Sequence, residues 1–179
     1  MTKTVTELTR ELGDREAIRD CLSRYGRAID RADFALLSDI FWPDASIEFE
    51  GLINGPISEY IEKIVPEAAQ AMEQTAHFLG NMLIEIDGDC AVTESYVQAF
   101  HRLANEDEPY DLVLGGRYLD RLEKRDDCWR ILSRRFVCDW FREYADSADW
   151  EKGFYGLKMS AGERFPADLS YSYFASASG

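Results

Sequence analysis

The stretch TAHFLGNMLIEIDG, residues 75–88, decides the fold. Its apolar residues predict a long strand over Thr75–Ile86, and the Asp87-Gly88 pair after it is typical of a tight hairpin turn. Cys90–Leu103 is expected to form the returning strand of that hairpin. The two strands would therefore pair in antiparallel fashion.

Two further strands are expected to continue this sheet. They cover Tyr110–Leu122 and Cys128–Phe141, and follow polar turns at Asn105–Pro109 and Arg125–Asp127. A Gly115-Gly116 pair inside one strand predicts a bulge or a close backbone approach, not a phosphate cradle. Four long strands joined by short turns are typical of an antiparallel sheet.

The chain before this sheet shows helical periodicity instead. A short helix is expected over Thr6–Leu12, ending at Gly13, and Asp14 is expected to cap a longer helix that runs to about Asp30. That longer helix would carry its apolar residues at helical spacing, at Ile18, Cys21, Leu22, Tyr25 and Ile29.

A second helix, a strand and a third helix are expected next. Asp33 would cap a helix that Pro43 ends. Alternating apolar and polar residues over Ala45–Glu50 predict a strand with one solvent-exposed face. Gly55-Pro56 would open the third helix, which Pro66 kinks or divides. This element order predicts an α+β fold, a curved antiparallel sheet with N-terminal helices on its concave face and a pocket between them.

The last part of the chain is polar yet rich in aromatic residues. We expect one domain over residues 1–145 and a C-terminal extension over 146–179 that closes the pocket or contacts a neighbouring subunit. The aromatic residues of this extension are Trp150, Phe154, Tyr155, Phe165, Tyr171, Tyr173 and Phe174.

The charge balance excludes several classes of partner. The 179 residues include 20 Lys and Arg and 34 Asp and Glu, a formal net charge of −14. Nucleic acids and anionic membranes need a basic face, so neither is expected as a partner. No apolar run approaches the ~20 residues of a membrane span, and the polar N-terminus is unlike a secretory signal.

Cysteine and histidine usage predicts a cytoplasmic protein that needs no cofactor. The cysteines are scattered without a C-x-x-C pair, which favours reduced thiols. With only two histidines, a zinc cluster is not expected. Phosphate loops, nucleophile elbows and dinucleotide fingerprints are also missing from the sequence. We therefore expect neither a cofactor nor a metal.

Two polar residues at unusual positions are candidates for catalysis. His77 lies inside an apolar strand, where period two places it on one face with Leu79, Asn81 and Leu83. It is either a core histidine bonded to the backbone or a general base, since imidazole titrates near pH ~6.5. Asp30 ends the first long helix. It either joins a surface charge network or points inward and accepts a hydrogen bond from His77.

Other polar residues have two interpretations each. His101, near a strand end, is more often exposed. Arg134 and Arg135 lie on opposite faces of the last strand, and periodicity does not decide which points inward. An inward arginine would suit a developing anion, whereas an outward one would snorkel from the sheet. Tyr25 belongs to the apolar stripe of the first long helix, where core packing is the default.

Taken together, these residues resemble the SnoaL-like proteins of the NTF2-like superfamily over about residues 10–142. Within that family the sequence is most similar to cofactor-free lyases such as γ-hexachlorocyclohexane dehydrochlorinase, scytalone dehydratase and bile acid 7α-dehydratase. The resemblance rests on Ile18, Tyr25, Asp30-Arg31, Asp33, Leu36 and Phe41-Trp42-Pro43-Asp44-Ala45, on Thr75–Asn81, and on Trp129–Arg135.

The resemblance implies roles for several residues. The catalytic Asp of the family falls on Asp30 and its catalytic His on His77. An anion-stabilising Arg in the last strand falls on Arg135, beside the alternative Arg134. Tyr25 matches a tyrosine of the bile acid enzyme, and His101 lies near the second histidine of scytalone dehydratase. Substrate-binding residues are expected at Asn81, Trp42, Phe49 and Tyr118.

The resulting hypothesis is a lyase that acts on a hydrophobic, aromatic or polycyclic small molecule. His77 would remove a proton, with Arg135 and Tyr25 or His101 stabilising the departing group. Alternatives with the same dyad are a C–C lyase that releases formaldehyde from a lignin-derived diarylpropane, an isomerase and a polyketide cyclase. A different class is the non-catalytic small subunit of a ring-hydroxylating dioxygenase, or a ligand-binding module. The resemblance also favours a homo-oligomer, a trimer over a dimer.

Overall fold

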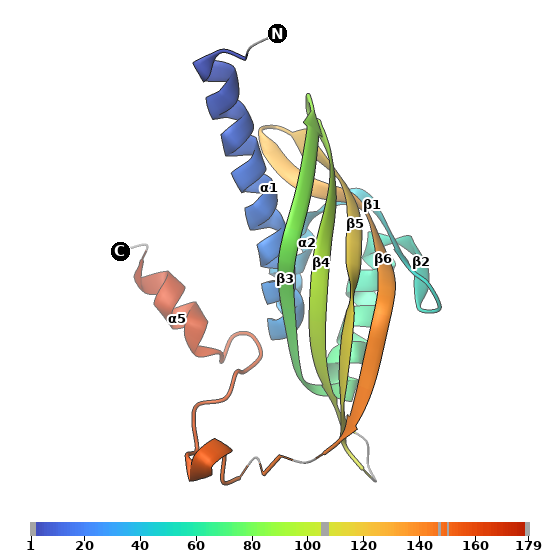
Figure 1. Cartoon of the computed structure of the whole chain (residues 1–179), viewed down its shortest axis with the longest axis vertical. Coiled ribbons are helices and arrows are strands. Elements are labelled where there is room, and N and C mark those ends of the chain that lie inside the picture. The colour runs from blue at the N-terminus through green and yellow to red at the C-terminus, as the bar shows by residue number, and fades with distance from the viewer. Residues whose placement is uncertain (1–2, 105–107, 147, 150, 178–179) are drawn as a thin grey trace.

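A computed structural model describes residues 3–104, 108–146, 148–149 and 151–177. The described chain forms one curved sheet with helices along one side (Figure 1). Part of the expected turn at Asn105–Pro109, and the expected aromatic contact of Trp150, lie outside the described residues. Within those ranges, every helix is too short or too polar to span a lipid bilayer.

The N-terminus forms one long helix, α1 (Val5–Arg31), so the break expected at Gly13 was wrong. A capping box starts the helix, because Thr4 and Glu7 bond reciprocally to each other's backbone N–H groups. A mid-helix glycine costs only about 1 kcal/mol, which tertiary packing of the apolar stripe readily offsets. That buried stripe comprises Ile18, Cys21, Leu22, Tyr25, Gly26 and Ala28.

Asp14 therefore joins α1 to the sheet instead of capping a helix. Its carboxylate accepts hydrogen bonds from Trp129 Nε1 at 2.8 Å and from Lys124 Nζ at 3.0 Å. The two donors pair with each other across neighbouring antiparallel strands, beside the turn that joins the last two long strands. The contact fixes the N-terminal half of α1 across the sheet.

Short elements connect α1 to the long strands. Helix α2 (Phe34–Ile40) begins as expected at Asp33, whose carboxylate accepts the Leu36 N–H at 3.0 Å. Strand β1 (Phe41–Phe49) is followed by a strand the sequence did not predict, β2 (Ile53–Pro56). The third helix is divided near Pro66, into α3 (Ile57–Glu59), a π-helical turn (Tyr60–Ile64) and α4 (Val65–Ala71).

The four long strands lie where the sequence predicted them, and three are longer than expected. They are β3 (Met72–Asp87), β4 (Cys90–Leu103), β5 (Tyr110–Arg125) and β6 (Cys128–Ala145). The strand order is β2-β1-β6-β5-β4-β3. All neighbouring pairs are antiparallel except β1 and β6, which run parallel. No hairpin constrains that pair, because a long stretch of chain separates the two strands.

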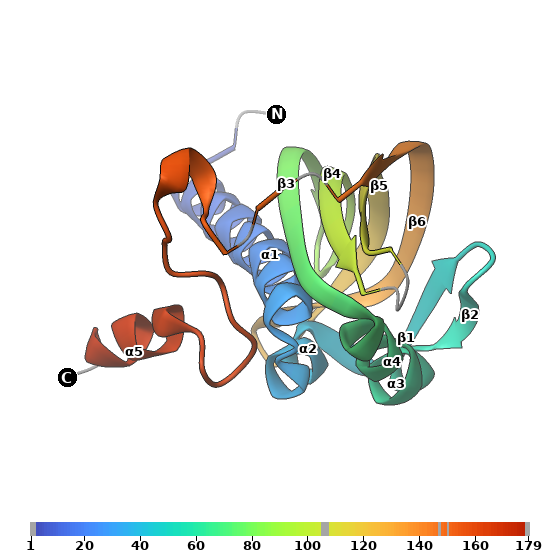
Figure 2. The ribbon, with the colours of Figure 1, turned by 90° about the horizontal axis from the view of Figure 1, so that it is seen from below.

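Seen from the end, the sheet curls around an interior that the helices close (Figure 2). Helix α1 lies along β3, and α2 to α4 lie across one end of the curl. Several register shifts bend the strands. One leaves Asn81 as an extra residue in β3, and another leaves Asp139 as an extra residue in β6, opposite Gly115–Gly116 of β5. The expected α+β architecture, with helices against a curved sheet, is confirmed.

The C-terminal segment leaves the end of β6 and returns to α1. It contains a 3-10 turn (Phe154–Gly156) and a helix, α5 (Leu169–Ser176), which the sequence did not predict. Phe165 N–H donates to the Arg31 carbonyl at the C-terminal end of α1. The segment thus lies beside the last turn of that helix (Figure 1).

Candidate functional site

Asp30 and His77 meet across the interface between α1 and β3. Asp30 Oδ1 lies 2.7 Å from His77 Nδ1, and Asp30 Oδ2 accepts the His77 backbone N–H at 2.8 Å. Only 14% of the Asp30 side chain and 8% of the His77 side chain are exposed. A carboxylate only accepts, so Nδ1 carries the shared proton and Nε2 of the neutral ring is left without one.

The sequence of α1 allows this close approach. Gly26 lies one turn before Asp30, and a Cβ at Gly26 would stand 3.3 Å from Leu79 Cδ1 and 3.5 Å from the His77 carbonyl oxygen. The missing side chain lets the helix backbone settle onto β3 at His77. The two donors from His77 also offset the unfavourable position of a carboxylate at the negative end of a helix.

His77 faces a cavity of about 310 Å³ between the helices and the sheet. Its wall is mostly apolar, which suits a small hydrophobic ligand. Eight of the nineteen residues that line it carry a polar group. They are Tyr25, Glu50, Tyr60, Thr75, His77, His101, Tyr118 and Arg164.

His101 lines the same cavity and is not an exposed strand-end residue. In the β3–β4 register it stands opposite Thr75, one step diagonally from His77, and the two imidazole rings are 5.4 Å apart. Burial, reinforced by the nearby His77, lowers the pKa of His101 to about 4. Its buried Nδ1 has no hydrogen-bond partner. The ring is therefore neutral near pH 7 and has spare hydrogen-bonding capacity.

Three tyrosines form a second polar group in the wall. Tyr25 and Tyr60 have hydroxyl oxygens 3.1 Å apart, and the Tyr118 ring packs edge-on against Tyr25. Burial raises the pKa of Tyr60 and of Tyr118 well above the ordinary value for a phenol. These hydroxyls therefore stay protonated and can donate to an oxygen of a ligand. Tyr25 and Tyr118 are two of the residues that the sequence singled out.

Arg135 does not reach the cavity, so the expectation for this residue was wrong. Its side chain is 58% exposed and pairs with Glu48 at 2.9 Å on the outside of the sheet. Arg134 is the inward arginine, fully buried in an ion pair with Asp120 at 2.7 Å. Its guanidinium lies 3.9 Å from the centre of the Tyr25 ring, behind the cavity wall and not in it.

Two expected substrate-binding residues also lie elsewhere. Asn81 is exposed on the opposite face of β3, because the bulge at Gly80–Met82 reverses the alternation that would have placed it beside His77. Asn81 has φ 35°, as this irregular position requires. Trp42 donates from Nε1 to the Glu123 carbonyl at 3.0 Å and does not line the cavity. Phe49, by contrast, lines it as expected.

Sequence reasoning missed Tyr60, Thr75 and Arg164. Tyr60 comes from the π-helical turn, and Thr75 precedes His77 by two residues on the same strand face. Period two could have revealed Thr75. Arg164 comes from the C-terminal segment and donates to the carbonyls of Asp30 at 2.8 Å and Met72 at 3.1 Å. Nothing in the local sequence signals that contact.

The His, Cys, Asp and Glu residues within the described ranges form no group of three that could hold a metal ion. The four cysteines are free thiols, and burial raises the pKa of Cys21 to about 12. The side chains at the cavity supply an imidazole–carboxylate pair, a second imidazole, three phenols and the charged groups of Glu50 and Arg164.

Known proteins share this sequence pattern and this architecture. A model of SnoaL-like domains matches residues 10–135. An uncharacterized protein of Mycobacterium tuberculosis is 34% identical over 128 residues, which cover 69% of this chain and 84% of that protein.

Two solved structures show the same fold. A candidate scytalone dehydratase from Novosphingobium aromaticivorans has a TM-score of 0.68 and 22% identity, over 77% of this chain and 92% of that one. A hexachlorocyclohexane dehydrochlorinase of type 2 has a TM-score of 0.67 and 21% identity, over 76% of this chain and 93% of that one. An NTF2-like protein from Novosphingobium aromaticivorans also shares the fold, with a TM-score of 0.57 and 23% identity over 78% of this chain and 92% of that one, which confirms the NTF2-like architecture. By its sequence this chain belongs to the SnoaL-like family.

Proposed function

We propose that this protein is a cofactor-independent lyase that eliminates water or a similar leaving group from a small hydrophobic molecule. One observation carries the proposal. The Asp30–His77 pair is shielded from bulk water and faces a mostly apolar cavity. Imidazole held in one tautomer by a carboxylate is a general base suited to neutral pH.

The chemistry would proceed as follows. Nε2 of His77 takes a proton from carbon, and Asp30 stabilises the imidazolium that forms. The electron pair of the broken C–H bond becomes a carbon–carbon double bond as the leaving group departs with its own bonding pair. For a hydroxyl leaving group, a tyrosine hydroxyl of the cavity wall donates the proton that completes water, and neutral His101 can only donate a hydrogen bond to the departing oxygen. The proton held on His77 later restores that donor.

The tyrosine group would stabilise negative charge that develops next to the reacting carbon. Tyr25 and Tyr60 are buried, and their hydroxyl groups are adjacent. Because these donors are already in place, they can polarise a carbonyl of the ligand without first having to reorient. Arg134 behind them adds positive charge that opposes the rise in the pKa of Tyr60 and Tyr118. Two of the structural neighbours are named as a dehydratase and a dehydrochlorinase, and both names denote elimination reactions. This supports the same reaction class here.

The same phenols favour isomerisation as a second candidate. A proton taken by His77 and returned to another carbon would shift a double bond with no loss of mass.

Product analysis of purified protein tests the proposal. The protein is incubated in D₂O with a panel of cyclic and aromatic β-hydroxy ketones, alicyclic halides and diarylpropanes. We expect loss of water or hydrogen halide from one class, at a rate reduced about 10²–10⁴-fold in His77→Gln. Arg135→Gln, outside the cavity, is the matched control and should keep full activity. Release of formaldehyde would instead indicate C–C cleavage. Deuterium uptake without loss of a leaving group would indicate an isomerase. Equal rates in the wild type and His77→Gln would refute the mechanism.

A further inference from the structure

Arg164 places a positive charge at the cavity wall, and no carboxylate in the described part of the chain lies within 4 Å of its guanidinium to form an ion pair. Its guanidinium donates to the Asp30 carbonyl at 2.8 Å, the Met72 carbonyl at 3.1 Å and Thr75 Oγ1 at 3.4 Å. All three acceptors are neutral oxygens. Burial lowers the pKa of Arg164, although the charge of the nearby Asp30 carboxylate opposes this shift.

Two other shielded arginines of the protein form an ion pair with a carboxylate. Arg134 binds Asp120 through Nε and Nη2, at 2.7 and 2.8 Å. Arg31 lies 3.3 Å from Asp168. Arg164 is half-buried, and a charge that has lost part of its hydration is stabilised by an anionic partner, so an arginine without an ion pair at a ligand cavity points to an anionic ligand.

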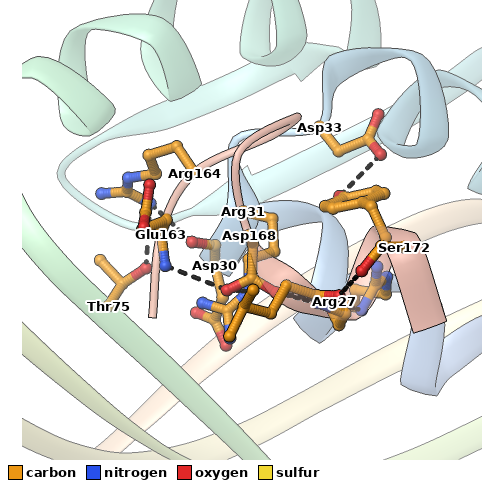
Figure 3. A network of polar contacts seen from close by, with 12 residues as sticks. Arg27, Asp30, Arg31, Asp33, Thr75, Glu163, Arg164, Asp168 and Ser172 are labelled. Carbon is orange, nitrogen blue, oxygen red and sulfur yellow. Dashed lines mark hydrogen bonds and ion pairs between the residues drawn. The ribbon is translucent and has the colours of Figure 1, made fainter. Parts of the chain in front are cut away.

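The C-terminal segment holds Arg164 in place from both sides (Figure 3). Asp168 accepts the Glu163 N–H at 3.0 Å, and the next residue after Arg164, Phe165, donates its N–H to the Arg31 carbonyl. Farther along, the Tyr171 hydroxyl donates to Asp33 at 2.9 Å. Arg164 is therefore a fixed part of the wall.

The donor groups of Arg164 are only partly used. A guanidinium has five N–H groups, and the three hydrogen bonds given above use two on Nη1 and one on Nη2. Nε–H and one Nη2–H remain. This is the edge with which Arg134 binds Asp120, and its geometry matches the two oxygens of a carboxylate.

We propose that Arg164 binds a carboxylate of the substrate, so that the substrate class is an aromatic or alicyclic acid. The inference rests on the proposed function, because it takes this cavity as the substrate site. Thr75, which Arg164 contacts, precedes His77 by two residues on the same strand face, a separation of about 6–7 Å. The carboxylate of the substrate would therefore lie at about this distance from the proton that His77 removes. Thr75 Oγ–H could add a further donor.

Binding of a matched pair of probes tests this inference without any turnover. Isothermal titration calorimetry at pH 7.5 would compare 1-naphthoate with its neutral analogue 1-naphthamide. We expect the wild type to bind 1-naphthoate at least tenfold more tightly. Arg164→Gln should bind the two compounds within about twofold of each other, and Arg164→Lys should keep part of the preference.

Two controls keep the outcomes distinct. Arg135→Gln, which changes an arginine outside the cavity, and His77→Gln should both retain the preference. The panel described above is extended to aromatic and alicyclic acids that carry a hydroxyl or halide leaving group. If this extended panel yields no product but the preference is found, the proposed function fails and the carboxylate subsite stands. Equal binding of the two probes by the wild type, binding of neither, or a preference that survives in Arg164→Gln would overturn the subsite.

Discussion

The Asp30 carboxylate holds His77 at two points, the backbone N–H and the ring Nδ1, with one oxygen for each. The first contact fixes the helix to the strand, and the second fixes the plane and tautomer of the ring. Because both come from one carboxylate, the orientation of the imidazole follows from the packing of α1 on β3. The base is thus preorganised by elements of the scaffold and not by a loop.

Replacing Asp30 with Asn should therefore reduce turnover with little loss of folding. The amide keeps the shape and can accept one hydrogen bond, but it removes the charge that stabilises imidazolium. We expect turnover to fall on the order of 10²-fold in steady-state assays with a substrate found in the panel. Circular dichroism would verify the fold. Full activity of Asp30→Asn would mean that His77 does not act through this carboxylate.

The neighbouring arginines Arg134 and Arg135 should differ sharply in their contribution to stability. Arg134→Met leaves Asp120 buried without its partner, which typically costs about 3–5 kcal/mol of unfolding free energy. Arg135→Met removes an exposed pair with Glu48, worth about 0–1 kcal/mol. Urea denaturation measures both. The double variant Arg134→Met/Asp120→Leu should recover much of the loss, and similar costs for the two single variants would contradict the burial described here.

His101 should make the protein less stable in acid. Burial holds its pKa at about 4, against an ordinary value near 6.5. As the pH falls from 6.5 towards 4, the unfolded chain binds a proton that the folded chain does not, so unfolding becomes easier. Above pH 6.5 the residue contributes no pH dependence.

The measurement for this prediction is the difference in unfolding free energy between the wild type and His101→Gln. When the pH falls from 7.5 to 4.5, the wild type should lose about 2 kcal/mol more unfolding free energy than His101→Gln. The subtraction cancels the titration of the carboxylates that both proteins share. A constant difference across this range would show that His101 titrates normally.

Asp168 should control the docking of the C-terminal segment. Hydrogen bonds from the Ser170 hydroxyl and from the Glu163 and Ser170 N–H groups hold the pKa of Asp168 well below its usual range. Asp168→Ala removes these acceptors and the partner of Arg31. Hydrogen exchange of residues 163–176 should become faster, while exchange in β3 to β6 stays unchanged. Tyr173→Phe, at an exposed residue of α5, is the control, and unchanged exchange in Asp168→Ala would exclude the role.

Much of the fold could be predicted because local signals agreed with each other. The Asp87-Gly88 turn and the apolar runs around it fixed the long hairpins, and Asp33 identified the start of α2. The break at Gly13 was predicted wrongly because local propensity was given more weight than the packing of the whole apolar stripe of α1. Strand β2 is short and half-exposed, so it leaves no periodic signal.

The candidate site divides in the same way. Six of the predicted residues belong to one site. Five of them line the cavity, namely Tyr25, Phe49, His77, His101 and Tyr118, and Asp30 contacts His77. Asn81 was misplaced because a bulge shifts the alternation by one residue, an event that period two does not foresee. Arg164 arrives from a segment far along the chain. The expected trimer and the cytoplasmic location remain predictions.

The protonation of the His77 ring tests the central claim most directly. ¹⁵N NMR of the neutral imidazole reports which nitrogen carries the proton. The contact with Asp30 predicts a protonated Nδ1 and a bare Nε2 in the wild type, and a mixture of tautomers in Asp30→Ala. A wild-type ring protonated at Nε2 would contradict the account, because that nitrogen could not then accept a proton from a ligand in the cavity.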